Sequence, residues 1–319
     1  MSISQKNFYA IFLGILAILI SAYIVPLYVN GDQIAYKGFF DNCILHNNSI
    51  TDKWICYTSY LGSKEPGYFL IMNFIGSIFD RVFINICANF LILFFLTKII
   101  FEKIKNGIER FSILFLLISN FYILVLFFSA ERLKFAFLFF LIFIICKKIY
   151  KYVFILFSLL THTQMIIIFL SLYINYIYNS KISLIRKILI NIFTFTFLLI
   201  FFILGRDHIV SKFDAYSTIV QESDSGFFSL LKVSILYFFT LFSYPRLSIV
   251  LAGFPILVSS YFLGSTRIMM IMFLFYFFTI VLYKKKTDVF FYLMMLYFSL
   301  KSINFISKII LYGDGFYIV

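Results

Sequence analysis

The sequence predicts an all-α integral membrane protein that crosses the bilayer many times. Of its 319 residues, 63% are hydrophobic and only 13% are charged, whereas a soluble domain is about 45–50% apolar and about 25% charged. The mean hydropathy is +1.01. A chain of this composition has too few polar side chains to cover an apolar core in water. This excludes a soluble enzyme, a disordered protein and a nucleic-acid-binding domain.

Nine apolar runs approach the roughly 20 residues that a helix needs to cross a bilayer. They are 8–29, 82–101, 111–129, 133–146, 188–204, 227–243, 247–263, 268–283 and 288–306. Two further stretches do not fit a simple span. Residues 66–80 are short and end at Asp80 and Arg81, and residues 152–178 are long and contain the polar segment 161–164 near their middle. With both stretches as short or re-entrant segments, we expect about 10–11 membrane segments.

The basic residues predict the topology, because short loops rich in Lys and Arg stay cytoplasmic. The net charge is +13, and about half of the basic residues fall into four clusters. These are Lys98/Lys103/Lys105/Arg110, Lys147/Lys148/Lys151, Lys181/Arg186/Lys187 and Lys284–Lys286. All four lie inside, with the N-terminus, if residues 66–101 make one net crossing and residues 152–180 enter the membrane and return.

In this topology, residues 1–319 form one multi-pass domain with extracytoplasmic loops at 30–65 and 205–226. Short outward turns follow at 129–134 and 264–267, and most of the 14 acidic residues lie outside. Cys43 and Cys56 share the first loop, so a disulfide between them can form if that loop faces an oxidising compartment. No Cys/His spacing typical of a metal site is present.

Two ionisable residues interrupt apolar runs. Arg132 lies in the segment 129–134; the plain alternative there is a turn in which Glu131 and Lys134 form a helix-end pair. However, topology does not require an outward arginine, and a planar guanidinium can hold a phosphate through two hydrogen bonds. His162 is the only histidine within an apolar run. It is either a hydrogen-bonded structural group, or a proton acceptor or phosphate ligand.

A third candidate is Glu65, which precedes Pro66 and Gly67 at the start of an apolar run. Pro in the first helical turn with an acid nearby is an ordinary helix-start pattern. A carboxylate at this depth could also act as a base or hold a sugar hydroxyl.

Further candidates lie at the outward loops. Arg267 has no acidic neighbour within ten residues, which favours anion binding over simple snorkelling. Arg206 either binds an anion or pairs with Asp207. Asp32 and Tyr36 open the first outward loop, where a solvated surface is the plain alternative to binding.

Together these motifs resemble those of the EpsG-like, Wzy-type polysaccharide polymerases, most strongly over about residues 30–170. The residues that carry the resemblance are Gly31-Asp32 with Tyr36, Glu65-Pro66-Gly67-Tyr68, Arg132 with Ala136, Lys147-Lys148, His162-Thr163, and Arg267 with Tyr276. The chain departs from the family pattern in two places: Arg132-Leu133 replaces Arg-Gln, and Thr161-His162 replaces Phe-His.

The resemblance implies a polymerase that joins oligosaccharide repeat units carried on undecaprenyl pyrophosphate, for O antigen, capsule or exopolysaccharide. The implied reaction is an inverting, metal-independent glycosyl transfer on the outer face of the bacterial plasma (inner) membrane, in a GT-C-like architecture. No Asp-x-Asp box is present, so we expect no metal or other cofactor. The implied partners are the lipid-linked donor and acceptor, membrane lipid and a separate chain-length regulator protein, and no nucleic acid.

The chemistry assigns roles to the candidates. Arg132, Arg267 and Arg206 would stabilise charge that develops on the pyrophosphate. Glu65 or His162 would act as the base, and Asp32 and Tyr36 would contact the acceptor.

Three other functions compete with the polymerase. A ligase of the O-antigen type shares the donor and the outward arginines. A flippase for lipid-linked oligosaccharides would show internal pseudo-symmetry, and none is visible. A membrane acyltransferase usually pairs a histidine with an acid, but no acid lies within fifteen residues of His162.

Overall fold

The computed structural model describes residues 3–46, 49–179, 226–263 and 265–317, with isolated positions between 183 and 196. Within these ranges the secondary structure is helical and contains no strand, which confirms the predicted all-α class. The chain forms two compact units, residues 1–165 with 285–319 and residues 166–284. Both Arg206 and most of the expected second loop, 205–225, lie outside the described residues.

Several helices are long and apolar enough to cross a membrane, so the chain is a multi-pass membrane protein. Within the described ranges there are five: Ser4–Leu27, Arg81–Lys103, Gly226–Ser243, Arg267–Lys284 and Val289–Tyr312. A bent helix pair raises the number to six if it forms one span. Shorter apolar helices of 10–17 residues accompany them: α4 (Pro66–Ile75), α9 (Lys151–Thr161), α10 (Met165–Asn179) and α14 (Leu247–Leu263).

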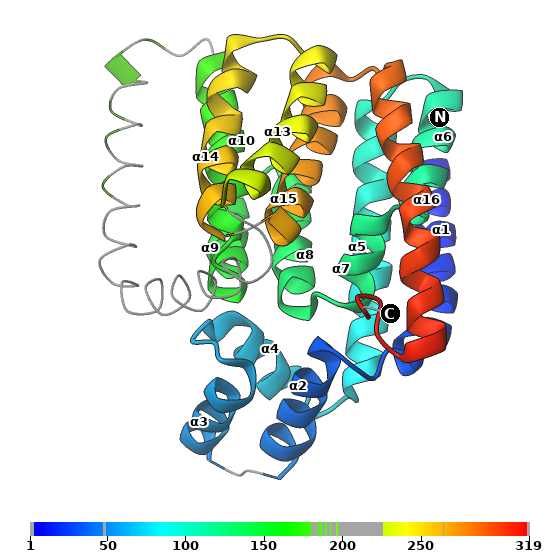
Figure 1. Cartoon of the computed structure of the whole chain (residues 1–319), viewed down its shortest axis with the longest axis vertical. Helices are drawn as coiled ribbons and strands as arrows, with labels where there is room; N and C mark the ends of the chain where they lie inside the picture. Colours follow the sequence, from blue (N-terminus) through cyan, green and yellow to red (C-terminus); the bar gives the residue numbers. More distant parts are fainter. Residues whose placement is uncertain are drawn as a thin grey trace. The chain divides into compact units, whose positions relative to one another are not determined.

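In the first unit, α1 (Ile3–Ile24) packs antiparallel along α5 (Arg81–Lys103). Near one end the Tyr9 and Phe101 rings stack at 5.6 Å, and near the other Asn89 donates a hydrogen bond to Ser21 Oγ at 2.9 Å. Figure 1 shows these helices beside α16 (Val289–Tyr312), which packs on α6 and α7.

The predicted run 111–129 is not one straight helix. It divides into α6 (Gly107–Ile118) and α7 (Phe121–Phe128), which are bent by 50° relative to each other. The cause is Asn120, whose side chain accepts a hydrogen bond from Tyr122 N at 3.0 Å and so caps a new helix. Asn favours this cap position because its side chain satisfies an amide that the helix leaves unpaired. The expected run is therefore broken, and the bent pair forms either one broken span or a re-entrant loop.

Both awkward stretches contain short helices instead of one simple span. Residues 66–80 yield only the ten-residue helix α4, and residues 152–178 divide into α9 and α10. His162 follows α9 with an extended backbone, at φ −153° and ψ 111°, which ends the helix. The predicted break at His162 is confirmed.

The expected first loop, 30–65, is a small helical subdomain rather than an open loop. It contains α2 (Asp32–Phe39), a π-helical turn at Phe40–Ile44 and α3 (Ile50–Leu61). A disulfide joins Cys43 to Cys56, with their Cα atoms 5.7 Å apart. Aromatic rings fill the space between the helices and α4, including the buried Phe39, Tyr57 and Tyr68. We call residues 32–61 the cap.

The second unit contains α13 (Gly226–Ser243), α14 and α15 (Ser265–Phe278), with a π-helical turn at Thr279–Lys284. These helices pack side by side (Figure 1). The contact between α13 and α14 is close, because a Cβ at Gly253 would lie 2.1 Å from the Tyr237 ring. The Tyr237 hydroxyl also donates to the Val250 carbonyl at 2.9 Å.

The disulfide generates a stability prediction for the cap. The cysteines are 13 residues apart in sequence, so replacing both with Ser should destabilise the cap by about 2–4 kcal/mol. Trp54 is the only tryptophan of the chain and packs on the Tyr57 and Phe69 rings. Its fluorescence during denaturation of the purified protein therefore reports on this region.

The matched control replaces Cys87 and Cys146, which form no disulfide. That variant should leave the Trp54 transition unchanged. If the Cys43→Ser/Cys56→Ser protein showed the same Trp54 transition as the wild type, the disulfide would not stabilise the cap.

Candidate functional site

A buried carboxylate, that of Glu65, is the centre of the candidate site. Glu65 is the N-cap of α4, yet its side chain makes no capping hydrogen bond and is only 1% exposed. Instead, the carboxylate accepts hydrogen bonds from Ser63 Oγ at 3.2 Å, Thr163 N at 2.9 Å and Thr163 Oγ1 at 2.8 Å. It also contacts Arg132 and His162. The carboxylate thus joins segments that are nearly 100 residues apart in sequence.

His162 contacts this carboxylate because α9 ends there. Its Nδ1 lies 3.1 Å from Glu65 Oε1 and 3.3 Å from Oε2. An ionised carboxylate only accepts hydrogen bonds, so Nδ1 is assigned as the donor. In this tautomer of the neutral ring, Nδ1 carries the proton and Nε2 carries the lone pair, so Nε2 can accept a proton.

Arg132 approaches the same carboxylate from the first turn of α8 (Glu131–Ile145). Its Nη1 lies 3.1 Å from Glu65 Oε2, and its side chain remains 14% exposed. Its Nε donates to the Tyr36 hydroxyl of the cap at 3.5 Å. The structure therefore brings together four of the predicted site residues: Glu65, Arg132, His162 and Tyr36.

The cap supplies two tyrosine hydroxyls to this region. Tyr57 donates to the Glu65 carbonyl oxygen at 2.9 Å. Burial raises the pKa of Tyr57 and also that of Tyr36, where the Arg132 charge acts in the opposite direction. Both hydroxyls therefore keep their protons at neutral pH and can act as hydrogen-bond donors.

The other predicted site residues lie elsewhere. Asp32 is exposed in the first turn of α2, and no hydrogen bond in the described part of the chain links it to Glu65. Arg267 belongs to the second unit, where it is half-buried in α15. Arg206 is not among the described residues.

A second buried ion pair adjoins the first, and sequence reasoning missed it. Glu131 does not pair with Lys134; it forms an ion pair with Arg81 and accepts a hydrogen bond from the Tyr68 hydroxyl at 2.8 Å. Arg81 Nη1 also donates to Gln33 Oε1 at 2.8 Å. Lys134 Nζ instead donates to Asn85 Oδ1 at 2.7 Å.

A sequence signal for this second pair exists. Arg81, Asn85 and Asn89 recur every four residues in an otherwise apolar span, which places them on one face of α5. Polar residues within a membrane span usually face the protein interior and are often functional. All three are buried.

The two ion pairs form one cluster that also contains the buried amine of Lys134. Its described members are two arginines, Arg81 and Arg132, two carboxylates, Glu65 and Glu131, and Lys134, which donates to the neutral Asn85. When Lys134 is protonated and His162 is neutral, the described side chains of the cluster carry one net positive charge. Uncompensated charge is unfavourable in a medium of low dielectric, so an anion that binds at the cluster would be stabilised.

The close packing of α4 on α9 depends on Gly67. A Cβ at this position would lie 2.4 Å from Thr161 Oγ1 and 2.6 Å from the Thr161 backbone nitrogen. The residue after Thr161 is His162, and Glu65 lies two residues before Gly67. The absence of a side chain at Gly67 therefore allows the carboxylate and the imidazole to meet.

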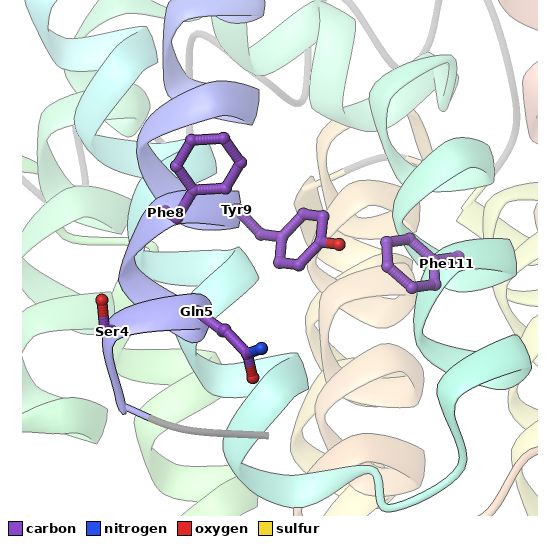
Figure 2. Close-up of a pocket in the computed structure, with 5 residues that line it drawn as sticks. All are labelled: Ser4, Gln5, Phe8, Tyr9 and Phe111. Atoms are coloured by element: carbon purple, nitrogen blue, oxygen red, sulfur yellow. The ribbon is translucent and has the colours of Figure 1, made fainter.

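A cavity of about 380 Å³ in the first unit lies away from this cluster. Figure 2 shows its lining by the first turns of α1, from Ser4 to Tyr9, and by Phe111 of α6. Tyr9 stacks on Phe101, near the end of α5 opposite Arg81. None of the predicted site residues lines this cavity. In the described ranges, no group of three or more His, Cys, Asp or Glu side chains is arranged to hold a metal ion.

Replacing Gly67 tests the α4–α9 contact. Gly67→Ala should destabilise the protein by about 1–3 kcal/mol, because the added methyl group meets backbone atoms that cannot move without shifting a helix. The measurement is the thermal midpoint of the purified protein in detergent.

The matched control is Gly107→Ala, since a Cβ there meets nothing within 4 Å. That variant should melt at or slightly above the wild-type temperature, because Ala favours a helix more than Gly does. Equal thermal midpoints for the two variants would show that the close approach at Gly67 does not affect stability.

Comparison of the chain with protein-family models, with curated proteins and with solved structures finds no match.

Proposed function

We propose that the chain is a membrane glycosyltransferase that polymerises oligosaccharide repeat units carried on undecaprenyl pyrophosphate. In this proposal the chain has about 10–11 membrane segments in a GT-C-like arrangement. The observation that carries the proposal is the buried cluster around Glu65, which combines a histidine oriented by a carboxylate with the guanidinium of Arg132 and the amine of Lys134. The histidine suits proton transfer, and the cationic guanidinium suits a pyrophosphate leaving group.

The proposed location of the cluster is the outer face of the plasma membrane. The cap that contacts it contains the Cys43–Cys56 disulfide, and disulfides persist in oxidising compartments. Helices α5 and α8 begin at the cluster and end near basic residues, including Lys103 and Lys147. Basic residues favour the cytoplasmic side, so they support the same orientation.

In the proposed reaction, His162 is the base and Glu65 orients it. Both oxygens of the Glu65 carboxylate already accept hydrogen bonds from donors within the protein, so in this proposal the carboxylate orients the imidazole and does not accept the hydroxyl proton. The imidazole donates Nδ1–H to that carboxylate and accepts the proton of the acceptor hydroxyl at Nε2. The hydroxyl oxygen forms a bond to the anomeric carbon of the donor, and the bond from that carbon to the pyrophosphate oxygen breaks. A single displacement of this kind inverts the anomeric configuration.

Arg132 stabilises the departing pyrophosphate in this proposal. Its guanidinium uses Nη1 on Glu65 and Nε on Tyr36, and its side chain is partly exposed. Its Nη2 atom can donate to a phosphate oxygen where negative charge develops in the transition state. Arg267 is proposed as a second pyrophosphate ligand.

A membrane acyltransferase is a second candidate, and one observation favours it. No acid is near His162 in sequence, but Glu65 contacts its Nδ1 in space. A histidine held by a carboxylate can also activate a hydroxyl for acyl transfer. The guanidinium of Arg132 beside His162 and Glu65 fits an anionic leaving group better, so the glycosyl transfer is preferred.

Glycan analysis tests the polymerase. Deletion of the gene should collapse the ladder of lipid-linked or surface glycan to a single-repeat band, and the wild-type gene should restore it. Arg132→Ala and Arg267→Ala should fail to restore long polymer at normal protein levels, with a loss of about 10²–10³-fold for one charge-stabilising group. Arg132→Lys should rescue poorly, because lysine lacks the planar fork.

Arg110→Ala is the control, because Arg110 lies near the end of α5 opposite Arg81. Normal chain-length distributions in both site variants would rule out the polymerase. Repeat units that accumulate outside the membrane, with no ladder or single-repeat band, would indicate a ligase. Accumulation inside would indicate a flippase, and a glycan that lacks only acyl groups would indicate an acyltransferase.

The pH dependence of transfer separates the roles of Glu65 and His162. Activity of the reconstituted wild-type protein should fall as the pH is lowered, because a protonated imidazole cannot accept the hydroxyl proton. In His162→Gln the residual activity should lose this acid limb, whereas Glu65→Gln should keep the limb at a shifted pH. An unchanged profile in both variants would remove both residues from the proton transfer.

A further inference from the structure

Arg81 is a buried cation that the proposed chemistry does not use. It is the first residue of α5, and its guanidinium joins Glu131 of α8 to Gln33 of α2. The backbone at this point is fixed independently, since the Asp80 side chain caps α5 by accepting from Val82 N at 2.8 Å. The guanidinium therefore extends from a fixed position.

The start of α8 depends on this contact. Its N-cap is Ala130, which has no side-chain acceptor to hold the first turn. Glu131 holds that turn instead, through Arg81 on α5 and the Tyr68 hydroxyl on α4. The same helix α4 has Glu65 at its N-cap. Glu131 thus fixes the start of α8 to the helix that presents the central carboxylate.

Arg132 is the next residue after Glu131. Successive side chains in a helix are rotated by about 100°, so fixing Glu131 against α5 and α4 also sets the direction of Arg132. The direction observed leads to Glu65 Oε2 and to the Tyr36 hydroxyl. A rotation of the first turn would break both contacts together.

We propose that Arg81 is a positioning residue, which holds Glu131 so that the adjacent Arg132 is directed onto Glu65. The effect on glycosyl transfer rests on the proposed function, whereas the effect on the Arg132–Glu65 contact does not. The alternative is a buried ion pair that contributes to folding and has no influence on Arg132.

Removing Arg81 alone cannot separate these two roles, because it leaves the Glu131 charge buried without a partner. Replacing both charges with apolar residues of similar volume is often tolerated. We therefore use the paired variant Arg81→Met/Glu131→Leu. Arg81→Lys is a milder second variant, since it keeps a charge for Glu131 but replaces the planar guanidinium, whose Nη1 donates to both Glu131 and Gln33.

A double-mutant cycle on the full-length protein in detergent tests the proposal without any activity. Thermal midpoints are measured for wild type, Arg132→Gln, the paired variant and the triple variant. If Arg81 positions Arg132, the loss caused by Arg132→Gln should fall to less than about half in the paired background. Equal losses in both backgrounds would overturn the proposal.

The matched control is Ser21→Ala/Asn89→Leu. These residues form a buried hydrogen bond between α1 and α5, two turns along α5 from Arg81. In that background Arg132→Gln should cause its full loss. A reduced loss here as well would show that any weakening of α5 has the same effect, and would overturn a specific role for Arg81.

Activity gives a second readout. Per folded molecule, the paired variant should lower kcat by about tenfold or more, with little change in KM for the lipid-linked donor. Adding Arg132→Gln to the paired variant should lower kcat no further. Arg81→Lys should lose less kcat than the paired variant does. Full kcat in the paired variant would overturn the positioning role. If the wild-type protein transferred no glycan, the proposed function would fail while the thermal cycle still decided the role of Arg81.

Discussion

The site depends on the burial of one carboxylate, that of Glu65. Taking a carboxylate out of water is unfavourable unless donors replace the lost hydration. The chain supplies them from four places: the turn before α4, the first turn of α8, the end of α9 and the residue after it. Each of these segments is thereby held to the others. The geometry of Arg132 and His162 follows from the need to satisfy the same pair of oxygens.

Sequence reasoning identified the centre of the site and missed its support. Arg132 and His162 were recognisable because each interrupts an apolar run, and Glu65 because it lies at the start of one; an ionisable side chain at such a place requires an explanation. The pairing of Arg81 with Glu131 was not recognisable in the same way. The partners are 50 residues apart, and the local pair Glu131 with Lys134 explained the same residues more simply.

The fold shows a similar division. The break at His162 was predictable, since a polar segment interrupts a stretch too long for one span. The break at Asn120 was overlooked, because Ser119 and Asn120 are the only polar residues between two strongly apolar segments. A hydropathy average includes the apolar neighbours of these two residues and therefore shows no break. The backbone nevertheless starts a new helix there, because the Asn120 side chain caps it. The helices of the cap were also missed, because its residues were assigned as a loop from their polarity.

The pairing of α5 with α8 also constrains how the protein enters the membrane. Arg81, Glu131 and Lys134 are buried in the first unit, and an isolated charged side chain at the centre of a membrane helix costs about 2.5–3.5 kcal/mol on insertion scales. Helix α8 carries three charged residues in its first four positions. Their partners precede them in the chain: Arg81 and Asn85 lie on α5, and Glu65 lies before α4. These partners are already available when α8 emerges during synthesis. The order of the segments along the chain therefore allows Glu131 and Arg132 to meet opposite charges, and Lys134 to meet a hydrogen-bond acceptor, as α8 enters the membrane.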